Sequence, residues 1–310
     1  MIAEQLYIMP QSISEAIEAA VLHKGNFKFI AGGTDVMVNR YQNNENSACL
    51  IDISKLNDLK GVRKEGDYLR IGALEELETL KNFSQIEDEF PMLIEAALSV
   101  GTPLLRKTAT IGGNVLCENR CLFYNQSEWW RESVGYCLKC DGDICIATKG
   151  RNACFSELVS DTAPALIAMD AELELLDENG PSKVKLEEIY TGDGVNPRNL
   201  SETTLLVAIL LPLNREFKTV YFKLRERESL EFTSLTSAVA LDKDNKLKIA
   251  LSGVDPKAVI VEGQVGNDKD DLIKKAVKGS RAVDNDMYSR KYRREMIAVY
   301  LNRSFKKLGI

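Results

Sequence analysis

Short apolar runs and amphipathic stretches alternate along the first part of the chain. After Ser12, apolar side chains recur at helical spacing, at Ile13, Ile17, Ala20 and Val21. Ser12 and Glu15 form a capping box, which predicts that a helix begins there, and Gly25 suits its left-handed end. The continuous apolar runs 27–31 and 49–53 predict two buried strands farther along.

The pattern then changes from strands to helices. Two apolar runs, 59–63 and 68–72, flank the turn Glu65-Gly66-Asp67, which predicts a β-hairpin. Helical patterning follows over 75–81 and 91–99, where Pro91 suits the first turn of a helix.

The last third of the chain has a second set of elements. Alternation over 171–177 predicts a strand, and residues 178–181 after it carry turn signals that predict a domain boundary. Further strands are predicted at 205–211, 220–224 and 247–251, with a helix over 233–241. Residues 267–308 carry helical patterning with many charges, among them the basic run 290–294, which we interpret as a solvated helix face or a subunit contact.

Composition narrows the classes of protein. Over 310 residues the net charge is −6, and this acidic balance argues against a nucleic-acid binder. No apolar run approaches the roughly 18–20 residues of a membrane span, and the first residues lack the features of a secretory signal. We therefore expect a cytoplasmic protein with reduced thiols.

Two glycine pairs indicate a phosphate site. Gly32-Gly33 follows an apolar strand, and Gly112-Gly113 follows Thr110-Ile111. Glycines let the backbone approach a ligand and direct N–H groups toward it. One such pair favours a plain tight turn, whereas two predict a pyrophosphate held between them. The dinucleotide fingerprint and the P-loop are both absent.

A dense group of cysteines follows the second glycine pair. Six of the seven cysteines fall between residues 117 and 154, at Cys117, Cys121, Cys137, Cys140, Cys145 and Cys154. In a reducing compartment such a group predicts a metal centre. Spacing alone favours the Cys-x-x-Cys pair 137 and 140 as ligands, and four cysteines suit either an iron–sulfur cluster or a structural zinc ion. Cys49 stands apart as a small core residue.

Histidine is nearly absent from the chain. His23 is the one histidine, so the chain lacks a histidine partner for triad or general-base chemistry. This favours a chain that carries electrons and leaves substrate chemistry to another protein.

Four motifs in order carry a family resemblance. They are AGGTD at 31–35, TIGGN at 110–114, SDTAP at 160–164 and FKLRERE at 222–228. They resemble the FAD-carrying medium subunit of the xanthine dehydrogenase and carbon monoxide dehydrogenase group of molybdenum enzymes. The resemblance covers essentially the whole chain. It implies an α+β fold with a vanillyl-alcohol-oxidase (PCMH) type FAD-binding domain of two α/β subdomains over 1–178. A C-terminal domain of antiparallel sheet and helices over 182–310 completes it.

The resemblance also implies which residues meet FAD. Lys28 to Asp35 and Thr110 to Asn114 would wrap the FAD pyrophosphate. Gly101 and Thr102 would lie near the flavin, and Asp161 and Lys223 would also lie at the cofactor. The full set is Lys28, Phe29, Ile30, Ala31, Gly32, Gly33, Thr34, Asp35, Gly101, Thr102, Thr110, Gly112, Gly113, Asn114, Asp161 and Lys223.

The cysteine segment resembles an insertion found in one branch of that family, the flavin subunit of 4-hydroxybenzoyl-CoA reductase. There a loop, here 117–156, holds an extra [4Fe–4S] cluster. The family's ligand steps of sixteen, eight and nine residues are kept by Cys121, Cys137, Cys145 and Cys154. The resemblance thus favours Cys145 over Cys140 and leaves Cys117 and Cys140 as bystanders.

The implied activity is that of an electron-transfer subunit. The partners would be a molybdopterin-binding large subunit and a [2Fe–2S] small subunit, assembled as a dimer of heterotrimers. A ferredoxin-like donor would deliver electrons through [4Fe–4S] and FAD to [2Fe–2S] and molybdenum for reductive dehydroxylation. Two alternatives stay open: a hydroxylase subunit that oxidises an N-heterocycle or aldehyde and sends electrons outward, and a zinc-stapled scaffold subunit without catalysis.

Overall fold

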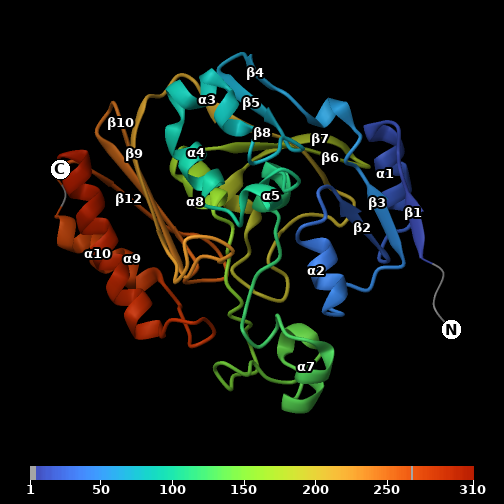
Figure 1. The fold of residues 1–310 in the computed structure, drawn as a ribbon. Coiled ribbons are helices and arrows are strands. Elements are labelled where there is room, and N and C mark those ends of the chain that lie inside the picture. Colours follow the sequence, from blue (N-terminus) through green and yellow to red (C-terminus); the bar gives the residue numbers. More distant parts are fainter. Residues whose placement is uncertain (1–4, 267) are drawn as a thin grey trace.

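The computed structural model describes residues 5–266 and 268–310, and the strands within them form three sheets (Figure 1). The first sheet is parallel, in the order β1 (Leu6–Ile8), β3 (Cys49–Asp52) and β2 (Phe27–Ile30). Helix α1 (Ile13–Leu22) connects β1 to β2 and buries its apolar residues against β3. The Ser12 hydroxyl accepts a hydrogen bond from the Glu15 N–H at 3.2 Å, which confirms the predicted helix start.

The second sheet is antiparallel and draws strands from distant parts of the chain. Its order is β4 (Val62–Glu65), β5 (Tyr68–Gly72), β8 (Leu205–Pro212), β6 (Glu172–Asp177) and β7 (Gly180–Lys185). The β4–β5 pair confirms the predicted hairpin. The expected boundary at 178–182 falls in the β6–β7 hairpin of this sheet, and β8 from beyond it pairs with β5 and β6. The passage to the next sheet therefore comes after Pro212.

The third sheet is an antiparallel meander of β9 (Phe217–Leu224), β10 (Leu235–Asp242), β11 (Lys246–Ser252) and β12 (Val259–Gln264). Helices α9 (Lys269–Gly279) and α10 (Arg290–Leu308) pack on one face (Figure 1). The mixed fold with an antiparallel C-terminal sheet and helices confirms the predicted α+β class.

A short helix with every residue buried lies among these layers. Helix α8 (Thr162–Ala168) contacts α4 (Pro91–Leu98) and the strands β10 and β11. Its apolar residues share one core with Ile71, Ile209 and Leu211 of the second sheet. The remaining elements are α2 (Val36–Tyr41), α3 (Ser84–Glu89), α5 (Pro103–Arg106), α6 (Ile111–Val115), α7 (Glu128–Val134) and the 3₁₀ turns Asn57–Leu59, Leu80–Asn82, Leu138–Cys140 and Leu186–Ile189.

Three predicted elements differ from the structure. The segment 233–241, predicted as a helix, forms most of strand β10. The prediction was wrong because both faces of the strand are buried, so its sequence lacks the apolar–polar alternation of a half-exposed strand. The predicted helix over 75–81 shortens to the 3₁₀ turn Leu80–Asn82. The glycine turn at 110–114 is the start of α6, which Thr110 caps by accepting a hydrogen bond from the Gly113 N–H at 3.1 Å.

The cysteine loop projects from the body with α7 at its far end (Figure 1). Its base is closed by a backbone pair, in which Arg120 and Glu157 exchange hydrogen bonds of 3.0 and 2.7 Å. The Glu157 carboxylate pairs with Arg293 of α10, and Arg293 also donates to the Gly253 carbonyl at 2.7 Å. The C-terminal helix thus holds the base of the loop. None of the helices in the described part of the chain has the length and apolar character that a membrane span requires.

Replacing Arg293 should destabilise the fold strongly. The side chain is fully buried, so Arg293→Met leaves the Glu157 carboxylate buried without its partner. We expect the free energy of unfolding to fall by about 3–5 kcal/mol, measured by urea denaturation. Arg290→Met is the matched control, because Arg290 on the same helix is exposed and its ion pair contributes about 0–1 kcal/mol. Equal losses in the two variants would contradict the role of the buried pair.

Candidate FAD cleft and cysteine cavity

The first glycine pair, Gly32-Gly33, lies where the backbone after β2 contacts the backbone at Thr108. β2 ends at Ile30, and the chain turns at once beside the Thr108 carbonyl. A Cβ atom on Gly32 would lie 1.7 Å from the Thr108 oxygen, so only glycine fits there. Gly33 has a φ of +71°, which also favours glycine. The turn is therefore fixed by backbone contact with the segment that leads into α6.

The second glycine pair packs against the middle sheet. A Cβ atom on Gly112 would lie 2.8 Å from the carbonyl oxygen of Ala73, and the Gly112 N–H donates to that oxygen at 2.9 Å. Asn114 turns away from the pair and holds α8 in place, since its side-chain oxygen accepts from the Thr162 hydroxyl at 2.7 Å and from Ser160 at 3.0 Å.

A cleft of about 560 Å³ lies between the two glycine pairs, within the usual size of a small-molecule site. Ten of the sixteen predicted FAD residues line it: Lys28, Phe29, Ala31, Gly32, Gly33, Thr34, Asp35, Thr110, Gly112 and Gly113. Two glycines without room for a side chain and a cleft lined by backbone turns fit an extended cofactor with a pyrophosphate. Ile30, Gly101, Thr102, Asn114, Asp161 and Lys223 do not line it.

Asp161 and Lys223 meet at a separate, buried place. Their carboxylate and ammonium groups are 2.7 Å apart, and Lys223 also donates to the carbonyls of Ser99 and Glu231, each at 3.0 Å. Burial raises the pKa of Asp161 to about 6, although Lys223 opposes the shift. Gly101 belongs to the same neighbourhood, since its carbonyl accepts from the Leu230 N–H at 3.1 Å. The structure therefore brings the second group of predicted residues together, apart from the cleft.

Asp35 has partners within the protein. Its carboxylate forms an ion pair with Arg120 and accepts from the Glu118 N–H at 3.0 Å. The Asn39 amide also donates to it at 3.3 Å. Asp35 thus ties the first glycine turn to the base of the cysteine loop, a contact that the sequence pattern does not reveal.

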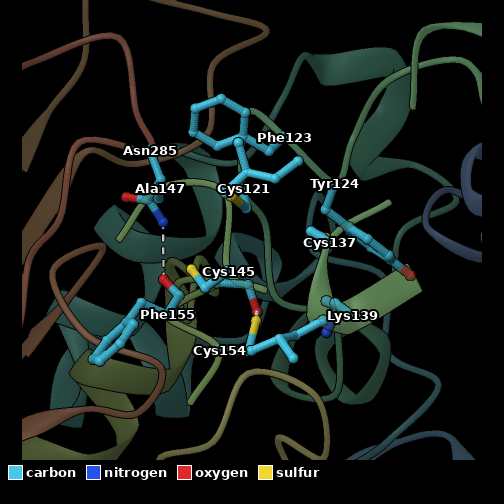
Figure 2. A pocket seen from close by; sticks show the side chains of 13 residues that line it. Cys121, Phe123, Tyr124, Cys137, Lys139, Cys145, Ala147, Cys154, Phe155 and Asn285 are labelled. Carbon is cyan, nitrogen blue, oxygen red and sulfur yellow. Dashed lines mark hydrogen bonds between the residues drawn. The ribbon is translucent and has the colours of Figure 1, made fainter. Parts of the chain in front are cut away.

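The four cysteines predicted as ligands line one cavity in the loop. Figure 2 shows Cys121, Cys137, Cys145 and Cys154 around it. Cys117 and Cys140 are not among its lining residues. Cys140 interacts with Cys137 and lowers the pKa of the Cys137 thiol. Burial raises the pKa of Cys121 to about 12.

The sulfurs do not converge on one point. In the described residues, no three His, Cys, Asp or Glu side chains are placed to hold a single metal ion. A [4Fe–4S] cluster requires a different arrangement, because each thiolate binds its own iron at a corner of the cluster. The described residues therefore show neither a zinc site nor a cluster site, and the cluster stays a prediction.

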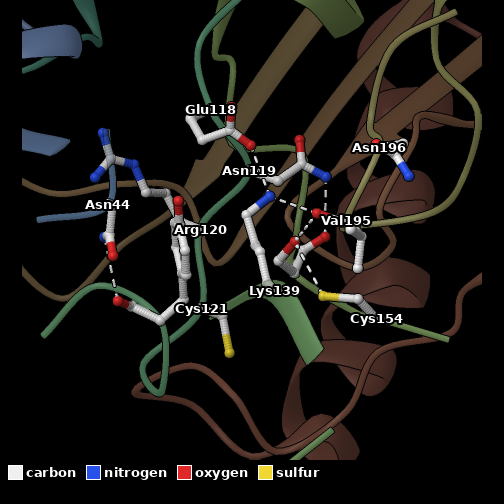
Figure 3. A network of polar contacts seen from close by, with 12 residues as sticks. Asn44, Glu118, Asn119, Arg120, Cys121, Lys139, Cys154, Val195 and Asn196 are labelled. Carbon is white, nitrogen blue, oxygen red and sulfur yellow. Dashed lines mark hydrogen bonds and ion pairs between the residues drawn. The ribbon is translucent and has the colours of Figure 1, made fainter. Parts of the chain in front are cut away.

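A half-buried ionic network connects residues of the cleft and of the cysteine cavity, and sequence reasoning missed it (Figure 3). Glu118, which lines the cleft, pairs with Lys139, which lines the cysteine cavity, at 2.6 Å, and with Arg198 at 3.1 Å. Lys139 also donates to the Gly194 carbonyl. Burial opposes the ionisation of Glu118, but Lys139 and Arg198 outweigh it and lower its pKa to about 2. These residues are far apart in sequence, so no spacing signal joins them.

Comparison with known proteins identifies the family. Residues 2–214 match the family described as the FAD binding domain in molybdopterin dehydrogenase. The chain belongs to this family. It is an FAD-binding subunit of the molybdenum hydroxylase type, as the motifs indicated.

Curated relatives are similar over most of their length. The aldehyde oxidoreductase FAD-binding subunit PaoB of Escherichia coli (strain K12) is 29% identical over 250 residues, 76% of this chain and 77% of that protein. The nicotinate dehydrogenase FAD-subunit of Eubacterium barkeri is 25% identical over 246 residues, 77% of this chain and 69% of that protein.

A solved structure shares the fold. A chain of carbon monoxide dehydrogenase from Hydrogenophaga pseudoflava superimposes with a TM-score of 0.74 at 19% identity, covering 99% of this chain and 98% of that one. Because the match spans both chains almost completely, the C-terminal sheet and its helices belong to the shared architecture as well.

Replacing Gly32 should weaken FAD binding. In Gly32→Ala the new methyl group collides with the Thr108 carbonyl and displaces the turn that lines the cleft. We expect the dissociation constant of FAD to rise about tenfold or more, which corresponds to about 1.4 kcal/mol. Flavin fluorescence during titration of the FAD-free chain measures it. Gly150→Ala is the control, because its methyl group would meet only the Thr148 hydroxyl at 3.3 Å, and unchanged binding in Gly32→Ala would contradict the site.

Glu118 should stabilise the fold in a pH-dependent way. Its pKa is lowered from 4.5 to about 2 in the folded chain, so the ionised carboxylate stabilises the fold above pH 4.5. That stabilisation, on the order of 3 kcal/mol, is lost as the pH falls from about 4.5 toward 2. Urea denaturation should therefore show Glu118→Gln to be less stable than the unsubstituted chain at pH 7, with the difference shrinking at pH 3. A difference independent of pH would contradict the ion pairs.

Proposed function

We propose that this chain is the FAD- and [4Fe–4S]-carrying electron-transfer subunit of a molybdenum enzyme of the 4-hydroxybenzoyl-CoA reductase type. A molybdopterin-binding large subunit and a [2Fe–2S] small subunit complete the enzyme as a dimer of heterotrimers in the cytoplasm. Electrons from a ferredoxin-like donor enter at the [4Fe–4S] cluster and pass through FAD to [2Fe–2S] and molybdenum, where an aromatic hydroxyl is removed reductively. FAD supplies the one- and two-electron chemistry, and the protein positions it.

The observation that carries the proposal is the cavity lined by Cys121, Cys137, Cys145 and Cys154. Four thiolates are the usual ligands of a [4Fe–4S] cluster. The cavity lies in a loop that contributes no strand to the middle sheet. A long loop inside a compact chain calls for a function of its own, and a cluster next to a flavin cleft supplies one.

FAD contact by the predicted residues belongs to the same proposal. The ten residues that line the cleft would hold the pyrophosphate and the adjoining parts of the cofactor. The flavin ring would lie near Gly101, Thr102, Asp161 and Lys223. Lys223 connects these residues, because it pairs with Asp161 and donates to the Ser99 carbonyl. Ile30 and Asn114 would act indirectly, by packing below the turn and by holding α8.

In a second candidate function, electrons leave the enzyme through FAD. The named relatives are subunits of an aldehyde oxidoreductase and a nicotinate dehydrogenase, and these names favour a hydroxylase that oxidises an aldehyde or an N-heterocycle. In that enzyme the substrate delivers electrons to molybdenum and FAD passes them to an acceptor. The two candidates differ in substrate and direction, so turnover by the whole complex separates them.

Cysteine variants should reveal the cluster ligands. Cys145→Ser removes a sulfur that lines the cavity, so we expect iron and acid-labile sulfide to be lost from anaerobically purified protein. Cys140→Ser is the matched control, because Cys140 lies in the same loop without lining the cavity. FAD content should stay unchanged in both variants. Iron loss in Cys140→Ser with iron retained in Cys145→Ser would overturn the ligand set.

The same preparation tests the activity. The whole complex, supplied with a reduced viologen, should convert 4-hydroxybenzoyl-CoA to benzoyl-CoA, and Cys145→Ser should abolish this reaction. Oxidation of aldehydes or N-heterocycles without that turnover would favour the second candidate. Zinc in place of iron and sulfide would leave only a structural role for the loop.

A further inference from the structure

The FAD cleft carries more carboxylates than cations. Four carboxylates and two cations are among its lining residues, namely Asp35, Glu45, Glu118 and Glu202 against Lys28 and Arg198. Like charges in one site repel each other, and a nearby cation offsets that repulsion. Because the phosphates of FAD are negatively charged, a cleft of this composition needs a cation directed at them.

The carboxylates of the cleft are held by partners in the protein. Asp35 and Glu118 each form an ion pair with a residue that does not line the cleft. Glu45 and Glu202 accept hydrogen bonds from backbone N–H groups at 2.7 and 3.0 Å. These carboxylates therefore keep a partner when a cation of the cleft turns to a ligand.

The first glycine turn offers hydrogen bonds without a full charge. Among the residues that the structure describes, the N–H groups of Gly33, Thr34 and Asp35 have no protein acceptor. Such N–H groups bind phosphate oxygens, but each carries only a partial positive charge. A full positive charge at the pyrophosphate must come from a side chain.

Arg198 supplies such a charge from a segment that no sequence motif marked. It lines the cleft, and its side chain is 18% exposed. Its guanidinium donates to the Cys117 carbonyl at 2.9 Å and to the Glu118 carboxylate at 3.1 Å. A guanidinium has five N–H donors in a planar fork that matches a phosphate group, so these bonds leave donors for a ligand.

The turn that carries Arg198 is closed by backbone hydrogen bonds. The Thr191 N–H donates to the Pro197 carbonyl at 3.1 Å, and the Asn199 N–H donates to the Ile189 carbonyl at 2.7 Å. These bonds lie on both sides of Arg198 along the chain. They fix its backbone relative to the cleft.

Lys28, the other cation of the cleft, is held less closely. Its side chain is 43% exposed, and its ammonium lies 3.8 Å from the Glu45 carboxylate. Arg198 is the cation whose position is set before a ligand arrives, and this reduces the entropy that is lost on binding.

From this placement we propose that Arg198 is a further FAD-binding residue, whose guanidinium donates to the pyrophosphate. The inference rests on the part of the proposed function that assigns this cleft to the pyrophosphate, and it requires no iron–sulfur cluster. Lys139 stays paired with Glu118 at 2.6 Å, so Arg198 is shared with the phosphate without leaving that carboxylate unpaired. No covalent bond forms or breaks.

The experiment measures FAD affinity at several salt concentrations. Flavin fluorescence during titration of the FAD-free chain gives the dissociation constant. We expect Arg198→Met to raise it about tenfold or more, because hydrogen bonds between charged groups are the strong ones. Its dependence on salt should also become weaker, since one charge pair that salt screens is lost. Arg198→Lys keeps the charge but loses the fork, so it should retain the salt dependence and bind FAD with intermediate affinity.

Arg281→Met is the matched control. Arg281 donates to the Gly192 carbonyl at 2.8 Å, in the same turn of the chain, but it does not line the cleft. This variant disturbs the turn without removing a charge from the cleft. The dissociation constant of FAD and its salt dependence should both stay as in the unsubstituted chain.

Several results would overturn the role of Arg198. An unchanged dissociation constant in Arg198→Met would do so, as would weaker binding with the salt dependence intact or equal losses in Arg281→Met, since these mark a residue that only packs the wall. If circular dichroism shows Arg198→Met to be unfolded, Arg198→Gln, which can still donate to the Cys117 carbonyl, is measured instead. Unfolding of both variants would also assign Arg198 to structure alone. Failure of the proposed function is distinct, because the unsubstituted chain would then bind no FAD.

Discussion

The contact between the backbone at Gly32 and the Thr108 carbonyl sets the geometry on which the rest of the site depends. It places the end of β2 against the segment that leads into α6, and so it brings two glycine pairs to opposite sides of one cleft. Any side chain at Gly32 would separate these segments. The end of the parallel sheet and the segment that leads into α6 therefore meet through backbone alone.

The cysteine loop depends on the same junction. Asp35, two residues after the glycine pair, binds Arg120 and the Glu118 N–H at the start of the loop. At the other end of the loop, Glu157 pairs with Arg293 from α10. The loop is thus attached to the FAD turn on one side and to the C-terminal helix on the other. These two attachments fix the position of the loop relative to the cleft.

Local pattern predicted the elements well where one face of an element is exposed. The capped helix after Ser12 was correct because its polar residues mark the solvent side, and the hairpin of β4 and β5 was correct because the turn Glu65-Gly66-Asp67 separates two apolar runs. β10 was mistaken for a helix because both of its faces are buried: Ala238 and Ala240 face the core around α8, while Val239 and Leu241 face α9 and α10. Burial on both sides removes the alternation that identifies a strand.

The sequence by itself determined the family, the two glycine pairs and the supply of cysteines, because these are carried by residue types in short motifs. Tertiary structure decided which side chains contact one another. It assigned the Asp35 carboxylate to Arg120, joined Asp161 to Lys223 and placed Arg198 beside Glu118 at the cleft. It also separated Cys145, which lines the cavity, from Cys140, which does not. Such choices depend on which distant segments pack together, and the burial that drives packing is a property of the whole chain, which no local spacing encodes.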